Sequence, residues 1–444
     1  MSEYVAGGYA IVRIMDRFME NGKMMAVYRE KEDLIDMIFG FLLALTPILQ
    51  HYKGIGVNAG FTVLILLWPW AMLKLAMNYR ELKPANIGIV LGLVVFMVYK
   101  EVIHGVSLFG LAYAVVMIVY FLAAACGGIN LKKIVSAAAK IAMVASILIC
   151  VQYVCYYILQ FHLQLVPTQL LLPESEIWVA GAQTGVIGVT GHRGDLYRPS
   201  AFFLEPSHMY LYLFPQLMLV LLASGMDRNR LKKAVLFSVG ILLTTSGMGL
   251  VTVVCAWLLF IAFYNPVDKS FAFKNFFRKQ NLLLMLAFAV CAVIAIVTVP
   301  FVRAAVMRFL DTSSGGAIAG RTRRAFGLLA TMSGTQWLVG VTANVSHIDF
   351  NLPGFVATLY KFGVVGVLLS YSGYVYTLIK VKAPYIWISA LIIMLSLFTA
   401  HTHGSFYMLY FMLILIQGAR EPEMKRALCL PCSFGGKRAK KTDA

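Results

Sequence analysis

The sequence predicts an all-α polytopic membrane protein with about twelve transmembrane helices and two large outward-facing loops. The first observation is composition, because 60% of the 444 residues are hydrophobic and only 13% are charged. Such a balance is typical of a chain whose solvent is largely lipid. The second is the grouping of apolar residues into runs close to the ~20 residues that cross a bilayer. The third is the concentration of Lys and Arg in alternate connections.

The apolar runs define the individual spans. Residues 233–264 admit more than one description, because Ser246-Gly247-Met248-Gly249 interrupts them. Two short helices, one long helix or a re-entrant pair are all compatible with this region. The predicted number of spans is therefore eleven to thirteen. The predicted spans are 34–50, 56–78, 85–104, 106–126, 134–161, 205–224, 233–246, 248–264, 281–302, 353–379, 385–401 and 404–418.

The basic residues predict the orientation of the chain. With the N-terminus inside, Arg80 and Lys83, then Lys132 and Lys133, and the later Lys-rich connections all face the cytoplasm. The net charge of +18 then reflects topology and attraction to lipid headgroups. Membrane lipids are therefore expected partners, and nucleic acid is not.

The same topology divides the chain into three segments, with both termini cytoplasmic. We expect a cytoplasmic or interfacial segment at 1–32, a transmembrane domain at 33–419 and a basic tail at 420–444. Two connections, 162–204 and 303–352, are long and face outward. Loops of this length are usually functional or disordered.

Both long loops contain arginine but no lysine. The guanidinium fork binds phosphate oxygens in a bidentate way and keeps its charge in a partly desolvated site. This bias indicates an anionic ligand. Ordinary ion pairing with the acidic residues of the loops is the alternative. The arginines are Arg193, Arg198, Arg303, Arg308, Arg321, Arg323 and Arg324.

The first loop ends where the sixth span begins. Pro206 suits the first turn of a helix, so Glu205 and His208 are expected at the outer mouth of that span. A carboxylate and an imidazole at a membrane boundary are candidates for catalysis and binding. A helix cap and a histidine at headgroup level explain the same residues equally well.

The second loop contains a short segment, residues 320–329, that is expected to be helical. Arg321 and Arg324 become neighbours on a helix and can hold one phosphate together, with Arg323 beside them. Further on, His347 precedes the tenth span and is a candidate general base. The outer Asp and Glu residues are scattered, so no metal site and no cofactor are predicted.

Two motifs resemble the Wzy-type O-antigen and capsule polymerases, a family that also includes the O-antigen ligases. Arg198-Pro-Ser-Ala-Phe-Phe-Leu-Glu205-Pro-Ser-His208 is similar to the segment where a large outer loop of those proteins enters a helix. Leu243-Thr-Thr-Ser-Gly-Met-Gly249 is similar to their Thr-x-Ser hairpin tip, with Met248 where Arg is often found. His347 and Asn351 loosely match a His-Asn stretch, without its adjacent pair. The resemblance covers roughly residues 130–420.

The resemblance implies a function. Undecaprenyl-diphosphate-linked oligosaccharides would be the substrates, joined by a metal-independent glycosyl transfer at the outer face of a bacterial cytoplasmic membrane. It implies His347 or Glu205 as catalytic groups, and Arg193, Arg198, His208, Arg321, Arg323 and Arg324 as binding groups. Flippase and chain-length regulator proteins would be further partners.

Two alternatives remain open at the level of sequence. One is a ligase of the same family, which moves the glycan to a different acceptor. The other is a polysaccharide transporter or flippase, which is expected to carry charged residues within its spans and to show repeated halves. Lys361 is the clearest buried-looking charge, and no internal repeat is apparent.

Overall fold

The protein is an all-α polytopic membrane protein. Among the described residues, six helices are long and apolar enough to cross a membrane, and four shorter apolar helices accompany them. The computed structural model describes residues 22–172, 186–187, 196–222, 228–265, 270–271, 273–299, 302–303, 306–307, 319–341, 352–381, 384–399 and 405–420.

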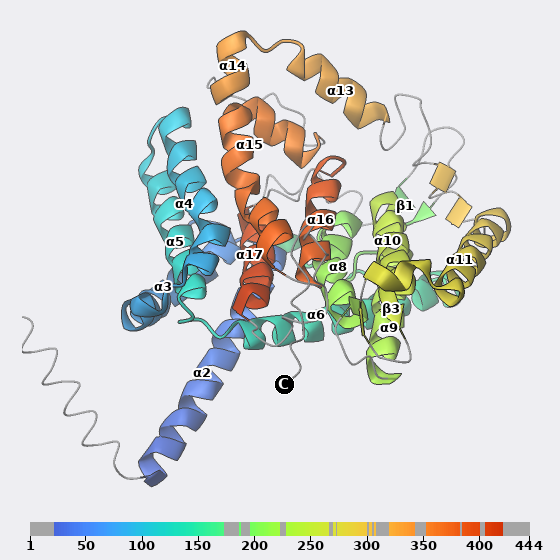
Figure 1. Ribbon diagram of the computed structural model, residues 1–444, viewed down its shortest axis with the longest axis horizontal. Coiled ribbons are helices and arrows are strands. Elements are labelled where there is room, and N and C mark those ends of the chain that lie inside the picture. Colours follow the sequence, from blue (N-terminus) through green and yellow to red (C-terminus); the bar gives the residue numbers. More distant parts are fainter. Residues whose placement is uncertain are drawn as a thin grey trace, which may run out of the picture.

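Each of the twelve predicted spans coincides with a helix (Figure 1). The ambiguous region at 233–264 forms two helices, separated at Thr244–Ser246. The twelve are α2 (Gly22–Leu49), α3 (Ala59–Asn78), α4 (Pro84–His104), α5 (Leu108–Ala125), α6 (Leu131–Tyr157), α8 (Pro206–Leu222), α9 (Arg228–Leu243), α10 (Gly247–Phe263), α11 (Lys279–Thr298), α15 (Gly354–Lys380), α16 (Tyr385–Ser396) and α17 (Ser405–Arg420).

The first helix differs from the prediction at its start. We expected a separate segment up to residue 32, but α2 begins at Gly22 and runs unbroken into the first span. No Gly or Pro occurs between Lys23 and Phe39, so nothing in this stretch ends a helix. Helix α2 thus spans the expected boundary at residue 32.

The last helix, α17, is the centre of the bundle (Figure 1). Every residue from Phe406 to Ile416 is at most 5% exposed. Helices α2, α4, α5, α6, α8, α15 and α16 all contact it. A helix that is apolar on every side is expected in such a position. By contrast, α11 lies at the periphery, where only Asn281 is buried, and its apolar side chains suit contact with lipid.

Tyrosine hydroxyl groups tie α17 to its neighbours. Tyr410 donates a hydrogen bond to the carbonyl of Tyr212 in α8 at 3.0 Å. Tyr212 in turn donates to the carbonyl of Ala44 in α2 at 2.8 Å, and the two tyrosine rings stack at 4.7 Å. The buried hydroxyls of Tyr212 and Tyr410 thus both have an acceptor, which stabilises helix contacts in a lipid-surrounded bundle.

The bundle has two distinct ends. At one, which we call the mouth end, α2 finishes while α8 and α17 begin, and Tyr407 of α17 donates a hydrogen bond to the carbonyl of His208. At the other, the basic end, the middle of α2 meets the end of α3, the start of α6 and the end of α17 around one cavity. The starts of α2 and α17 therefore lie at opposite ends.

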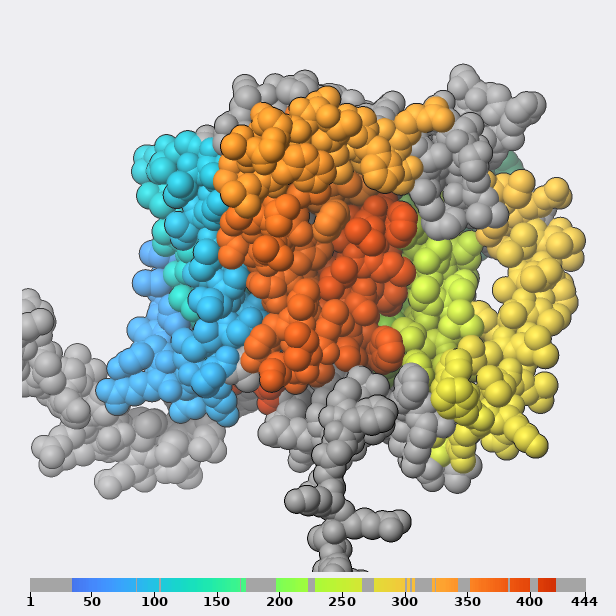
Figure 2. All heavy atoms as spheres, turned by 45° about the horizontal axis from the view of Figure 1, so that its top comes forward, coloured from blue at the N-terminus to red at the C-terminus, as the bar shows by residue number. Residues whose placement is uncertain are grey.

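Short elements occupy the connections. Helices α13 (Ala319–Leu329) and α14 (Gly334–Val339) belong to the second long loop and lie across one end of the bundle (Figure 2). The first long loop contains η2 and a two-stranded antiparallel sheet of β1 and β2. The remaining short elements are η1 (Tyr79–Glu81), η2 (Thr168–Leu170), β1 (Val186–Ile187), β2 (Leu196–Tyr197), β3 (Tyr264–Asn265), β4 (Ser270–Phe271) and η3 (Phe273–Phe277).

Candidate functional site

The start of α8 holds two of the residues singled out by sequence. Helix α8 begins at Pro206, as expected, because proline at the first helical position has no amide hydrogen to leave unpaired. Glu205 is half-buried beside it and accepts a hydrogen bond from the Ser207 hydroxyl at 2.6 Å. His208 is only 2% exposed. His208 is therefore packed inside the protein.

His51, which the sequence analysis missed, completes this group. Its ring stacks on that of His208, with centroids 4.5 Å apart and an interplanar angle of 18°. His51 follows α2 and is held there because its carbonyl accepts a hydrogen bond from the Leu172 amide at 3.0 Å. The available signal was a polar run, Gln50-His51, directly after an apolar span.

Tyr407 joins the group from α17. Its hydroxyl donates to the His208 carbonyl at 2.9 Å, and it lies close enough to Glu205 to interact electrostatically. We call His51, Glu205, His208 and Tyr407 the mouth cluster. It brings a carboxylate and two imidazoles together at one end of the bundle, and both kinds of group transfer protons near neutral pH.

The segment before α8 is pinned to the end of α6. The Ala201 amide donates to Gln152 Oε1 at 2.9 Å, and Gln152 Nε2 donates to the Leu163 carbonyl at 3.0 Å. Tyr197 packs face to face on Tyr156 at 4.0 Å, and burial raises the pKa of Tyr197 to about 12. Arg198 is half-buried directly after this tyrosine, so its backbone position is fixed by the aromatic packing.

Three of the candidate arginines lie on α13. The expected short helix is present as Ala319–Leu329. Ala325 is buried against Tyr360 of α15, with Leu328 and Val356 beside them. Positions 321 and 324 lie one helical turn before Ala325 and Leu328, whereas Arg323 is exposed.

Helix α13 stands over the mouth end. It packs on the beginning of α15, and the Gly354 amide there donates to the Thr399 carbonyl just after α16 at 2.7 Å. The chain re-enters at Ser405 to begin α17, which carries Tyr407 of the mouth cluster. The arginine helix and the mouth cluster therefore share one end of the bundle.

A break in α15 adds polar groups that sequence did not locate. The helix is interrupted at Gly363, which has φ 65° and ψ −170°. The Tyr99 hydroxyl donates to the Phe362 carbonyl at 2.9 Å and lies 3.2 Å from that of Val339. Lys361, beside the break, lies close enough to Lys100 of α4 for repulsion. Lys100 Nζ is 3.8 Å from Glu101 Oε1.

The hairpin of α9 and α10 reaches the same end. Thr245 at its tip has a positive φ of 51°, and the Thr244 hydroxyl donates to the Ile241 carbonyl at 2.6 Å. A side-chain carbon added at Gly249 would lie 3.4 Å from Cβ of Tyr210, which is two residues after His208 in α8. The Thr-Thr-Ser-Gly motif thus lies next to the first turns of α8.

Other candidates lie outside the described residues. Arg193 and His347 are among them, and so is Arg308. Within the described residues, no group of three or more His, Cys, Asp or Glu side chains is placed to hold a metal ion.

Comparison with known proteins adds no assignment. No protein-family model matches the chain, and no curated protein matches it either. The description of the site therefore rests on the residues of this chain.

Proposed function

We propose that the protein polymerises lipid-diphosphate-linked oligosaccharides by metal-independent glycosyl transfer at the mouth end. In this proposal the mouth end faces outward from a bacterial cytoplasmic membrane, and both termini are cytoplasmic. The growing glycan passes from one undecaprenyl diphosphate onto a new lipid-linked repeat unit.

The reaction needs a base and a holder for the leaving group. The acceptor hydroxyl oxygen forms a bond to the anomeric carbon of the donor glycan, and its proton passes to Glu205 or His347. The bond from that carbon to the diphosphate oxygen breaks, and the lipid diphosphate leaves with the electron pair. Arg321 and Arg324, with Arg198, stabilise this charge, which is commonly the largest catalytic contribution.

One observation carries the proposal. The mouth cluster and the arginine helix α13 lie at the same end of the bundle, although they come from separate parts of the chain. A half-buried carboxylate and two imidazoles lie at the same end as a helix with three arginines, and these groups are suited to both parts of the chemistry. The resemblance of the segment from Arg198 to His208 to Wzy-type polymerases supports the same assignment.

The test is polymerisation by the purified protein. Detergent-solubilised protein is given lipid-linked repeat units in the presence of a chelator, and the products are separated by size. We expect a ladder of products with wild type and little or none with His347→Ala, and the same loss with Glu205→Gln if Glu205 is the base. A single transfer to a different acceptor would identify a ligase, and absence of any glycosyl transfer by folded wild type would refute the proposal.

Transport is the second candidate, favoured by the break in α15. Discontinuous helices with charged residues beside the break are typical of transporter binding sites, and Lys361 lies beside such a break. The purified system separates the two functions, because detergent micelles have no second compartment. Product growth there requires an enzyme, whereas lipid movement in vesicles without product growth would indicate a flippase.

A further inference from the structure

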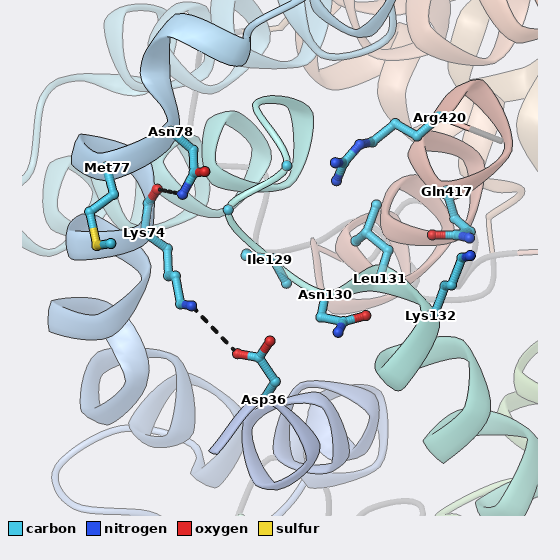
Figure 3. Close-up of a pocket in the computed structure, with 12 residues that line it drawn as sticks. Asp36, Lys74, Met77, Asn78, Ile129, Asn130, Leu131, Lys132, Gln417 and Arg420 are labelled. Carbon is cyan, nitrogen blue, oxygen red and sulfur yellow. Dashed lines mark hydrogen bonds and ion pairs between the residues drawn. The ribbon is translucent and has the colours of Figure 1, made fainter. Parts of the chain in front are cut away.

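A cavity of about 510 Å³ lies at the basic end, away from the mouth cluster (Figure 3). Four parts of the chain line it: the middle of α2 at Asp36, the end of α3, the connection from α5 into α6, and the end of α17. None of its residues takes part in the chemistry proposed above.

The lining of this cavity is positively charged. It contains Lys74, Lys132 and Arg420 against the single carboxylate of Asp36, which leaves three positive charges and one negative. Lys74 Nζ lies 3.8 Å from Asp36 Oδ1, and both side chains are 12% exposed. Lys132 and Arg420 are exposed, and no carboxylate of the described residues forms an ion pair with either.

Two glycines form the floor. Gly127 has a positive φ of 86°, and an added side-chain carbon there would collide with the Arg420 guanidinium. At Gly128 it would lie 2.6 Å from the Lys74 carbonyl oxygen. Because neither glycine has a side chain, α17 brings Arg420 toward the centre of the cavity, opposite the pair of Lys74 and Asp36 (Figure 3).

The start of α6 adds to the positive potential. This helix is 27 residues long and begins at Leu131, with Asn130 as its N-cap. Asn130 Oδ1 accepts from the Lys133 amide at 3.4 Å, while the amides of Leu131 and Lys132 have no acceptor within the helix. A helix N-terminus beside an arginine and a lysine attracts phosphate.

We propose that this cavity binds the phosphate of an anionic phospholipid headgroup. The apolar surface next to it favours a lipid over a soluble phosphate compound. Ile35 and Ile38 of α2 are 43% and 48% exposed, and Leu73 and Met77 of α3 are 57% and 65% exposed. These two helices pack together, so acyl chains can lie along them while the headgroup enters the cavity.

The test measures ligand-induced stabilisation of the full-length protein in detergent. The probes are phosphatidylglycerol, neutral phosphatidylcholine and inorganic phosphate, and each is titrated while the Tm is recorded. The pocket variant is the double substitution Lys132→Gln and Arg420→Gln. Its matched control is Lys232→Gln with Lys233→Gln, which removes the same charge from exposed positions of α9.

We expect phosphatidylglycerol to raise the Tm of wild type and of the control. The pocket variant should bind it roughly tenfold or more weakly, the effect of losing a charge-assisted hydrogen bond. Equal Tm shifts in the two double variants, or an equal shift with phosphatidylcholine, would overturn the proposal. An equal shift with inorganic phosphate alone would overturn the lipid as the source of the phosphate. If the pocket variant does not fold, Arg420→Lys replaces it, because it keeps the charge and loses the guanidinium fork.

Discussion

The rings of His51 and His208 stack with their centroids 4.5 Å apart, although the two residues come from distant parts of the chain. The first follows α2 and the second lies in the first turn of α8. His208 is nearly inaccessible to solvent. The ring of His51 is one of the groups that contact its imidazole at the mouth end. This contact makes His51 the strongest addition to the candidate site.

The role of His51 is tested by two substitutions. His51→Phe keeps an aromatic ring against His208 but removes the ring nitrogens, whereas His51→Ala removes the stack as well. We expect both to reduce product formation at least roughly tenfold, as for loss of a hydrogen bond to a charged group. Only the alanine variant should also lower the Tm. Full activity of His51→Phe would limit His51 to packing.

A comparison of variants at Glu205 and Ser207 distinguishes a catalytic role of Glu205 from a role in capping helix α8. Glu205→Gln keeps an oxygen that can accept the hydrogen bond from Ser207, but it removes the charge. If Glu205 is the base, turnover should fall by about 10²- to 10⁴-fold, with the protein still present in the membrane. Ser207→Ala is the control, because it removes the 2.6 Å hydrogen bond and keeps the carboxylate. Equal turnover of the two variants would exclude Glu205 as the base.

The arginines of α13 are tested by lysine substitutions, which keep charge and lose the bidentate fork. Arg321→Lys and Arg324→Lys are expected to reduce product formation at least roughly tenfold, since one stabilising donor is worth about 10²- to 10³-fold. Arg323→Lys should have a smaller effect, because Arg323 is exposed. The readout is product length and yield at matched protein level. The same loss in all three variants would contradict the placement of the phosphate along positions 321 and 324.

The break in α15 is tested with a pair of glycines that both have positive φ. An added side-chain carbon at Gly363 would collide with the Leu338 carbonyl, whereas at Gly105 it would meet nothing within 4 Å. Both alanine variants bear the strain of a positive φ, about 1–3 kcal/mol. Gly363→Ala should therefore lower the Tm in detergent more than Gly105→Ala. Equal losses would mean that α14 does not constrain the break.

The orientation of the chain is tested by cysteine labelling in intact cells. Gly334 is exposed at the start of α14 and has open space around it, so Gly334→Cys should react with an impermeant reagent from outside. Lys132→Cys at the basic end should react only after permeabilisation. The parental protein, with its seven native cysteines, provides the background. Labelling in the reverse pattern would place the candidate site in the cytoplasm and remove the basis of the proposed reaction.

The sequence alone determined the fold class and the helices. Long apolar runs have few alternatives in lipid, because every backbone polar group must be satisfied within the segment. The start of α8 at Pro206 was equally local, because it depends on the geometry of one proline. The sequence did not decide whether residues 233–264 form one helix or two. The turn at Thr244–Ser246 that separates α9 from α10 depends on a positive φ at Thr245.

Only the tertiary structure decided which residues meet. The apolar segment of α17 suits the centre of the bundle, but the equally apolar α11 lies at the periphery, so the sequence does not choose between them. Nothing near His51 indicates His208 as its neighbour. The same holds for Arg420 beside Gly127 and for Lys361 beside Lys100. These pairs arise from helix packing, which depends on the fit of side chains from distant parts of the chain. Hydropathy is a property of each segment and fixes where a helix lies in the chain, whereas the partners of that helix depend on all the others.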